Sequence, residues 1–154
     1  MVRGTFRTDP ISALGLPPPV SIGKDASVGA ALAAVQKFGQ GYVLVLDGDL
    51  PRGIMTDRDV VMKVVARQVS YETSVMDIAS DIPQTLTARD PIAAAVQVMQ
   101  DKEIDNIPVV DDAGKAVGVI RTLDIVHFLA EAFPQEVLNL PPRPHQLMPK
   151  PEGG

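Results

Sequence analysis

The sequence GIMTDRD at residues 53–59 occurs again, altered, as GVIRTLD at residues 118–124. Each copy follows an apolar run that ends in an acid, VLVLD at residues 43–47 and PVVDD at residues 108–112. The glycines, the final acids and the apolar runs of the two copies are 65 positions apart. A repeat of this length indicates two supersecondary units that complete each other's core. We therefore expect two similar units and look for function in the cleft between them.

Both copies predict the same order of elements, which is strand, helix, strand, strand, helix. Asp47-Gly48 is a hairpin-turn signal between the two adjacent strands of the first copy. The pattern therefore predicts an α/β fold built from two βαββα units. In the first copy we expect strands at 20–22, 42–46 and 53–55, a helix from Val28 that ends before Gly39, and a second helix capped by Thr56 or Asp57. In the second copy we expect strands at 85–87, 107–110 and 116–120, a helix after the cap Asp90 and the first-turn Pro91, and a helix from Thr122 or Leu123 to about Ala132.

These elements divide the chain into five segments. Residues 1–19 are expected to be extended because Pro17-Pro18-Pro19 disfavours helix. The first unit spans residues 20–67 and the second spans residues 84–132. Residues 68–83 form a polar connector with a short helix near Val75. Residues 133–154 form a proline-rich tail that does not build a core of its own.

The composition excludes several classes of protein. The net charge of −5 and an aromatic content of 4% argue against a nucleic-acid partner, which favours a basic face and stacking side chains. The absence of cysteine excludes disulfides and thiolate chemistry. No secretory signal precedes the repeat, and no apolar run approaches 18 residues, so we expect no membrane association and a cytoplasmic location.

The junction at Thr56 offers groups that suit a nucleoside phosphate. A helix start presents unsatisfied amides to an anion, and the Thr56 hydroxyl adds a hydrogen bond. The Asp59 carboxylate can accept from both hydroxyls of a ribose. Strand residues Val20, Tyr42 and Val43 can sandwich a flat heterocycle. On the junction alone, a helix cap worth about 1 kcal/mol is the commoner explanation for such a threonine or aspartate.

The paired motif resembles the cystathionine-β-synthase (CBS) domain, and residues 8–131 resemble a tandem pair of such domains, or Bateman module. The ending at residues 132–142 is similar to the tails of small stand-alone bacterial members. The resemblance implies two βαββα units packed about a pseudo-twofold axis. It also implies a regulatory module rather than an enzyme, with AMP, ADP, ATP, S-adenosylmethionine or NAD bound between the units. No residue is expected to be catalytic or to ligate a metal.

The resemblance assigns roles residue by residue. It gives phosphate contact to Thr56 and ribose contact to Asp59, and in the second copy it carries over only the acid, Asp124. Arg121 stands where the pattern has Thr or Ser, so it either supplies a cation to a polyphosphate or fills the second site. We expect one good site, on Thr56 and Asp59. The expected ligand-binding residues are Val20, Ile22, Tyr42, Val43, Thr56, Arg58, Asp59, Ile107, Pro108, Arg121 and Asp124.

Two other functions compete with nucleotide sensing. One is a ligand-free oligomerisation or interaction module with a degenerate pocket. The other is a nucleotide hydrolase, which is disfavoured because the sequence has no phosphate loop and no convergent histidine cluster. His127 and Glu131 are four apart on a helix, but without an evident third ligand we interpret them as a surface pair. The other histidine, His145, lies in the tail.

The resemblance also implies association with other chains. We expect a homodimer or a higher homo-oligomer, and a separate protein as the regulated partner. The candidate interface residues are apolar positions on the helix that closes each unit, and simple core packing is the alternative for each of them. These candidates are Val60, Val64, Ile125 and Phe128.

Overall fold

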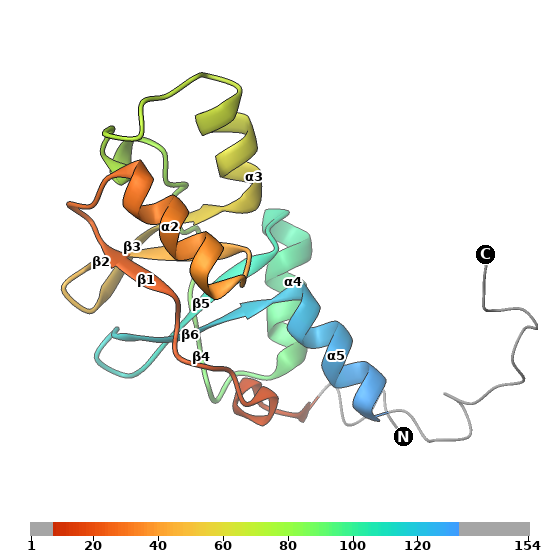
Figure 1. Ribbon diagram of the computed structural model, residues 1–154. Coiled ribbons are helices and arrows are strands. Elements are labelled where there is room, and N and C mark those ends of the chain that lie inside the picture. Colours follow the sequence, from red (N-terminus) through yellow and green to blue (C-terminus); the bar gives the residue numbers. More distant parts are fainter. Residues whose placement is uncertain (1–7, 133–154) are drawn as a thin grey trace, which may run out of the picture.

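The computed structural model describes residues 8–132 and shows one three-stranded sheet for each repeat (Figure 1). In each sheet the first strand runs parallel to the second, and the second is antiparallel to the third. The first sheet contains β1 (Ser21–Gly23), β2 (Tyr42–Asp47) and β3 (Leu50–Thr56). The second contains β4 (Leu86–Thr87), β5 (Asn106–Val110) and β6 (Ala116–Arg121). The prediction of two βαββα units in an α/β fold is confirmed.

The central strands are continuous apolar runs because both of their faces are covered. Val43 pairs with Met55, and both side chains are fully buried. The β2–β3 turn places Gly48 at φ +64°, a conformation that glycine adopts without strain. Both hairpins shift register at one point, between Val45 and Leu46 and between Val109 and Val110. The two copies therefore share even this irregularity.

The helices pack against these sheets, one before and one after each hairpin (Figure 1). The first repeat has α2 (Val28–Phe38) and the short α3 (Asp57–Asp59), which continues as the π-helix η2 (Val60–Val65). The second repeat has α4 (Ile92–Lys102) and α5 (Thr122–Ala132). None of the helices described between residues 8 and 132 is long and apolar enough to cross a membrane.

Of the helix caps that we predicted, the one at Asp90 is wrong. Ser27 caps α2, since its hydroxyl accepts from the amide of Ala30, and Thr56 caps α3. We expected Asp90 to cap the helix that follows it, with Pro91 in the first turn. Instead Pro91 is the N-cap residue, without a side-chain cap, and the Asp90 carboxylate accepts from the amide of Thr87 at 2.8 Å.

We expected the segment before β1 to be extended, but part of it is helical. Residues Ile11–Leu14 form the 3₁₀-helix η1, which lies beside the second repeat (Figure 1). The amide of Ile11 donates to the carbonyl of Asp90 at 2.8 Å, and the Ile11 side chain is buried in the core of that repeat. The local sequence does not reveal this docking because its partners lie about 80 residues away.

The two cores are joined across the interface between the repeats. Ala116 and Val119, from β6, belong to the core of the first repeat. The amide of Ala116 also donates to the carbonyl of Asp49, in the first hairpin turn, at 3.0 Å. The repeats therefore form one packed body, and each hairpin lies against the other.

The connector runs along the first repeat before it reaches β4. It contains the 3₁₀-helix η3 (Val75–Asp77), close to the short helix that we expected. Ser80 then pairs with Ile54 of β3 through two backbone hydrogen bonds of 2.8 and 3.0 Å. This pairing fixes the connector beside the Thr56 junction. The predicted proline-rich tail, with His145, lies outside the described residues.

Candidate functional site

A cleft of about 690 Å³ opens between the repeats, and residues of both motif copies line it. Thr56, Arg58 and Asp59 contribute from the first junction, and Arg121 contributes from the second. The connector at residues 80–83 lines the cleft beside the first junction, and the segment that leads from α4 into β5 lines it on the side of the second repeat. The cleft therefore exists only because the two repeats face each other.

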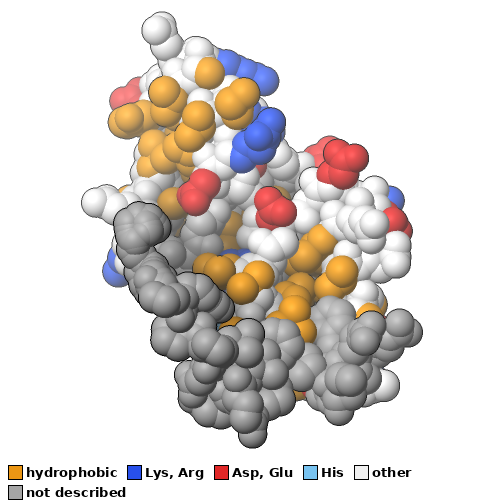
Figure 2. Space-filling view, turned by 90° about the vertical axis from the view of Figure 1, so that its right-hand side faces the viewer, with side chains coloured by type: hydrophobic (Ala, Val, Ile, Leu, Met, Phe, Trp, Pro, Cys, Tyr) orange, Lys and Arg blue, Asp and Glu red, His pale blue; other side chains and the backbone are white. Residues whose placement is uncertain are grey.

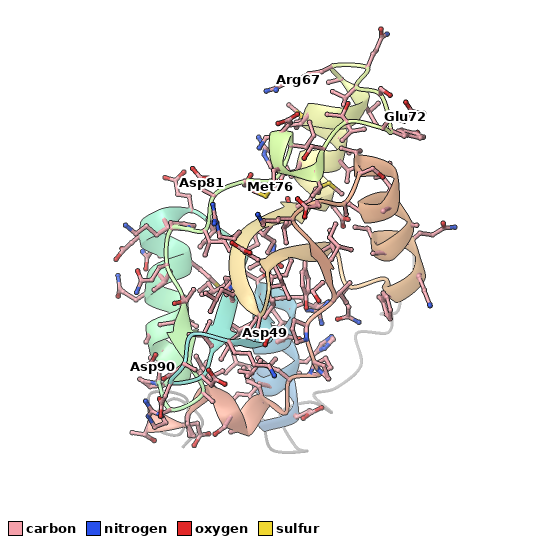
Figure 3. The ribbon with its side chains drawn as sticks, turned by 90° about the vertical axis from the view of Figure 1, so that its left-hand side faces the viewer. Asp49, Arg67, Glu72, Met76, Asp81 and Asp90 are labelled. Atoms are coloured by element: carbon pink, nitrogen blue, oxygen red, sulfur yellow. The ribbon has the colours of Figure 1, made fainter. Side chains whose placement is uncertain are left out.

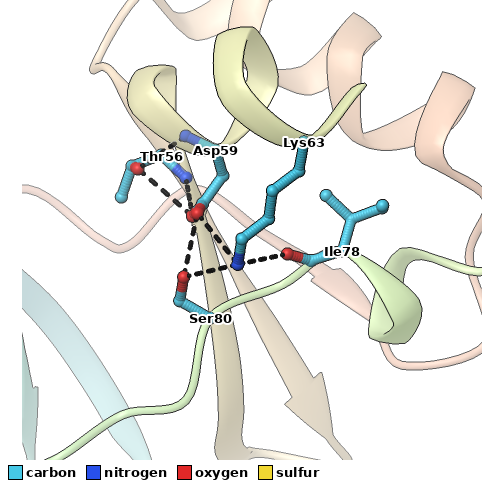
Figure 4. Close-up of polar contacts among 5 residues, drawn as sticks. All are labelled: Thr56, Asp59, Lys63, Ile78 and Ser80. Carbon is cyan, nitrogen blue, oxygen red and sulfur yellow. Dashed lines mark hydrogen bonds and ion pairs between the residues drawn. The ribbon is translucent and has the colours of Figure 1, made fainter. Parts of the chain in front are cut away.

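The first junction holds a compact polar network (Figure 4). The Thr56 amide and hydroxyl both donate to Oδ2 of Asp59, at 3.0 and 3.2 Å, and the Asp59 amide donates back to the Thr56 hydroxyl at 3.3 Å. The Ser80 hydroxyl donates to Oδ1 of Asp59 at 2.9 Å, and Nζ of Lys63 lies 3.2 Å from the same oxygen. Lys63 also donates to the carbonyl of Ile78 and to the Ser80 hydroxyl, at 3.1 and 3.0 Å.

This network is both a helix cap and an ion pair. The reciprocal contacts of Thr56 and Asp59 form a capping box, which satisfies amides at the start of α3. The Asp59 side chain is only 9% exposed, so its charge requires the compensation that Lys63 provides. Both of its oxygens already accept hydrogen bonds from the protein. The capping interpretation and the ligand interpretation of Asp59 therefore apply to the same carboxylate.

The second junction uses the corresponding acid differently. The Asp124 carboxylate accepts a hydrogen bond from the Arg121 amide at 2.8 Å. It also accepts hydrogen bonds from Nε and one Nη of the Arg121 guanidinium, at 3.3 and 2.8 Å. The remaining Nη donates to the carbonyl of Gln40 in the first repeat at 3.2 Å. The hydrogen bond to Asp124 is the main cause that raises the pKa of Arg121. Arg121 thus links the two repeats and is already paired.

Arg121 also lies near the buried phenol of Tyr42. The Tyr42 hydroxyl accepts from the amide of Val20 at 3.2 Å, and the ring is 3% exposed. Burial raises the pKa of Tyr42, while the hydrogen bond and the charge of Arg121 act in the opposite direction. This region is packed protein rather than open cleft.

The structure brings together five of the predicted ligand-binding residues. Thr56, Arg58, Asp59, Pro108 and Arg121 all line the cleft. Arg58 is exposed, and its side chain makes no ion pair or hydrogen bond with residues 8–132. It is therefore a cation available to a ligand.

The other predicted residues do not line the cleft. Most are held in the two cores, and Asp124 lies behind Arg121. The core residues are Val20, Ile22, Tyr42 and Val43 in the first repeat and Ile107 in the second. The reason is geometrical: the cleft is lined by β3, through Ile54 and Thr56, and by β5 of the opposite repeat, whereas β1 and β2 do not reach it. We predicted that these residues contact a ligand. That prediction is untested, and the packing of their side chains in the cores argues against it.

Sequence reasoning missed two residues of the network. Lys63 is four positions after Asp59 on the continuing helix, a spacing that predicts an ion pair and was a usable signal. Ser80 is 21 positions away, in the connector, and no periodicity identifies it. Neither repeat offers a metal site, since no group of three or more His, Asp or Glu side chains within residues 8–132 is arranged to hold one.

Known proteins resemble this chain over most of its described part. A sequence model of the CBS domain matches residues 11–66 and 75–131. A Methanopyrus kandleri protein is 39% identical over 94 residues, which cover 60% of this chain and 48% of that protein. A Schizosaccharomyces pombe protein, named for the meiotically up-regulated gene 70, is 27% identical over 77% of this chain and 16% of its own length. The chain spans less than half the length of these curated relatives.

Solved structures agree with the fold. A CBS domain protein from Pyrobaculum aerophilum complexed with AMP superposes with a TM-score of 0.70 at 26% identity, covering 80% of this chain and 99% of that one. A protein with CBS domains from Burkholderia ambifaria gives 0.69 at 26% identity, covering 85% and 94%. A CBS domain pair solved with 5′-methylthioadenosine and S-adenosyl-L-methionine gives 0.70 at 22% identity, covering 77% and 98%, and shows the fold alone. With two family matches in tandem and the fold of solved pairs, the chain belongs to the CBS domain family as a tandem CBS domain pair.

Proposed function

We propose that this chain is a regulatory module that binds an adenine nucleotide in the cleft between its repeats and does not catalyse a reaction. The observation that carries the proposal is the cleft itself, because both motif copies line it. Its volume lies within the range of roughly 300–1,000 Å³ that is typical of small-molecule sites. The AMP bound to the Pyrobaculum aerophilum protein supports this ligand class.

The side chains at the first junction suit a phosphate and a ribose. Arg58 supplies a cation without an internal partner, and the Thr56 hydroxyl lies beside it at the junction. Asp59 offers carboxylate oxygens to ribose hydroxyls at the wall of the cleft. We place the phosphate at Thr56 and Arg58, the ribose at Asp59 and the base toward Pro108 of the second repeat.

The charges of the cleft favour a ligand with few phosphates. Carboxylates of Asp57, Asp81, Glu103 and Asp105 also line it, and none of them has an ion pair within residues 8–132. Asp81 lies on the connector between the two halves of the molecule (Figure 3). Of the cations that line the cleft, Lys63 and Arg121 are paired with carboxylates, and Arg58 has no carboxylate partner among residues 8–132. We therefore expect AMP to bind more tightly than ADP, and ADP more tightly than ATP.

The test is a thermal-shift titration with AMP. At 100 times the dissociation constant, a ligand stabilises the native state by about 2.7 kcal/mol, which raises the melting temperature by roughly 5–10 °C at this chain length. Arg58→Ala should remove most of the shift. Arg67→Ala is the matched control, since Arg67 is exposed at the far end of the same helical region, away from the cleft (Figure 3). An equal shift in both variants, or none in the wild type, would count against the proposal.

A second function, association without ligand, is favoured by one observation. Apolar side chains are exposed on the helix that closes each repeat. They are Val61, Met62 and Val65 on η2 and Leu123 and Val126 on α5. Figure 2 shows hydrophobic side chains gathered at the upper end of the molecular face that it draws. The interface residues that we expected from the sequence pack instead with the two cores: Val60, Val64, Ile125 and Phe128. Size-exclusion chromatography with light scattering, with and without AMP, separates this function from nucleotide binding.

A further inference from the structure

The Asp59 carboxylate is occupied in the structure by a hydroxyl that comes from the protein itself. Ser80 Oγ donates to Oδ1 of Asp59 at 2.9 Å, and both residues line the cleft. The other carboxylate oxygen, Oδ2, belongs to the capping box with Thr56. A ribose hydroxyl that approaches Asp59 from the cleft therefore meets Oδ1 with Ser80 already bound to it.

The Ser80 hydroxyl can leave without disturbing the fold around it. Its backbone is fixed by two hydrogen bonds to Ile54, so rotation of one side-chain bond releases Asp59. Lys63 stays within reach of Oδ1 and of the Ile78 carbonyl, so the carboxylate keeps its counter-ion. The exchange replaces one hydroxyl donor with another on Oδ1, and Lys63 gives up its contact with the Ser80 hydroxyl while it keeps Asp59 and the Ile78 carbonyl.

The second repeat has no such exchangeable group. The segment that approaches Gly118 as residues 79–80 approach Gly53 is Leu16-Pro17, which carries no hydroxyl. The acid of that repeat, Asp124, is held by the guanidinium of Arg121 instead. Removal of a bidentate cation would leave a poorly exposed carboxylate unpaired, which costs far more than the exchange of a hydroxyl.

We propose that the Ser80 hydroxyl is an internal substitute for a ribose hydroxyl and competes with the bound nucleoside for Oδ1 of Asp59. This inference rests on the proposed function of the cleft and adds a specificity-determining residue to it. The connector between the repeats thereby sets the affinity of the cleft. The ribose contact therefore adds to the affinity only by the amount that it exceeds the contact that Ser80 gives up.

The test is isothermal titration of the full chain with AMP and with 2′,3′-dideoxy-AMP, which lacks both ribose hydroxyls. Ser80→Ala should bind AMP roughly three- to tenfold more tightly than the wild type, the equivalent of one net hydrogen bond. The same variant should bind the dideoxy analogue with unchanged affinity, because that ligand does not displace Ser80. Ser80→Thr, which keeps the hydroxyl, should return AMP affinity to the wild-type value.

Ser70→Ala is the matched control. It makes the same substitution in the same connector, where the hydroxyl accepts from the Glu72 amide outside the cleft, and it should leave both affinities unchanged. Equal or weaker AMP binding by Ser80→Ala, or an equal gain with the dideoxy analogue, would overturn this inference and leave the proposed function standing. Absence of AMP binding by every protein, Ser80→Ala included, would overturn both.

Discussion

Asp59→Ala should destabilise the fold itself, because Asp59 accepts from four protein donors. Loss of the Asp59 half of the capping box, which leaves the Thr56 amide without its acceptor, costs about 1 kcal/mol. Breaking a buried ion pair costs about 3–5 kcal/mol, but Lys63 is 28% exposed and keeps two other acceptors, so we discount that figure. We expect a total loss of about 3 kcal/mol in the free energy of unfolding. At roughly 2–4 °C per kcal/mol the melting temperature should fall by about 6–12 °C.

Urea unfolding with a double-mutant cycle measures this loss and assigns it. Asp59→Ala combined with Lys63→Met should be less destabilised than the two single losses added together, because no unpaired charge remains. Asp77→Ala, at an exposed acid in η3, is the control and should change stability by no more than about 0.5 kcal/mol. A loss below about 1 kcal/mol in Asp59→Ala, or strict additivity with Lys63→Met, would refute the idea that Asp59 is the centre of a compensated network.

Three further changes probe other parts of the molecule. Arg121→Ala should cost about 2 kcal/mol in urea unfolding because Asp124 loses its bidentate partner, and Arg121→Lys should restore less than half of that loss. Glu103→Gly should stabilise the fold by about 0.5–1 kcal/mol, since Glu103 ends α4 at φ +56°; a loss of stability would show that its side chain is needed there. Tyr42→Phe should destabilise by about 1–3 kcal/mol, because the buried Val20 amide loses its acceptor. Burial raises the pKa of Tyr42 above its ordinary value of 10.0, so the folded state keeps this proton to higher pH than the unfolded chain does. The resulting stabilisation is lost as the pH rises above about 10, and Tyr42→Phe should flatten that fall in stability.

Much of the fold could be predicted from the sequence because its signals are local and occur twice. The Asp47-Gly48 turn and the apolar runs beside it identify the first hairpin, the matching apolar runs of the second copy identify the second, and the glycine-to-acid motif identifies each strand-to-helix junction. The docking of η1 on the second repeat could not be predicted, since Ile11 finds its hydrogen-bond partner at Asp90. Contacts of that separation leave no periodic pattern in the chain.

The residues of the two motif copies in the candidate site could be predicted from the sequence, but the residues around them could not. Thr56 and Asp59 follow from the motif, and the departure at Arg121 is visible when the two copies are compared. The opposite wall was not predictable, because the packing of the repeats decides that Pro108 lines the cleft with Thr56 while Tyr42, the neighbour of Thr56 in the sheet, is buried. A sequence pattern defines one unit, while the cleft is a property of two.

The inequality of the two repeats is the main conclusion about function. Asp59 has a hydroxyl partner that a ligand can replace, whereas Asp124 has a guanidinium partner that it cannot easily replace. Where the first copy has Thr56 the second has Arg121, which links the repeats through the Gln40 carbonyl, and we propose that this difference removes the second site. The nucleotide should bind on the side of Thr56.

The stoichiometry of AMP binding tests this conclusion most directly. Isothermal titration of the wild-type chain with AMP should give one ligand per chain, and Arg58→Ala should weaken that binding while Arg121→Ala should not abolish it. Two equivalent AMP molecules per chain, or no binding at any accessible concentration, would contradict it.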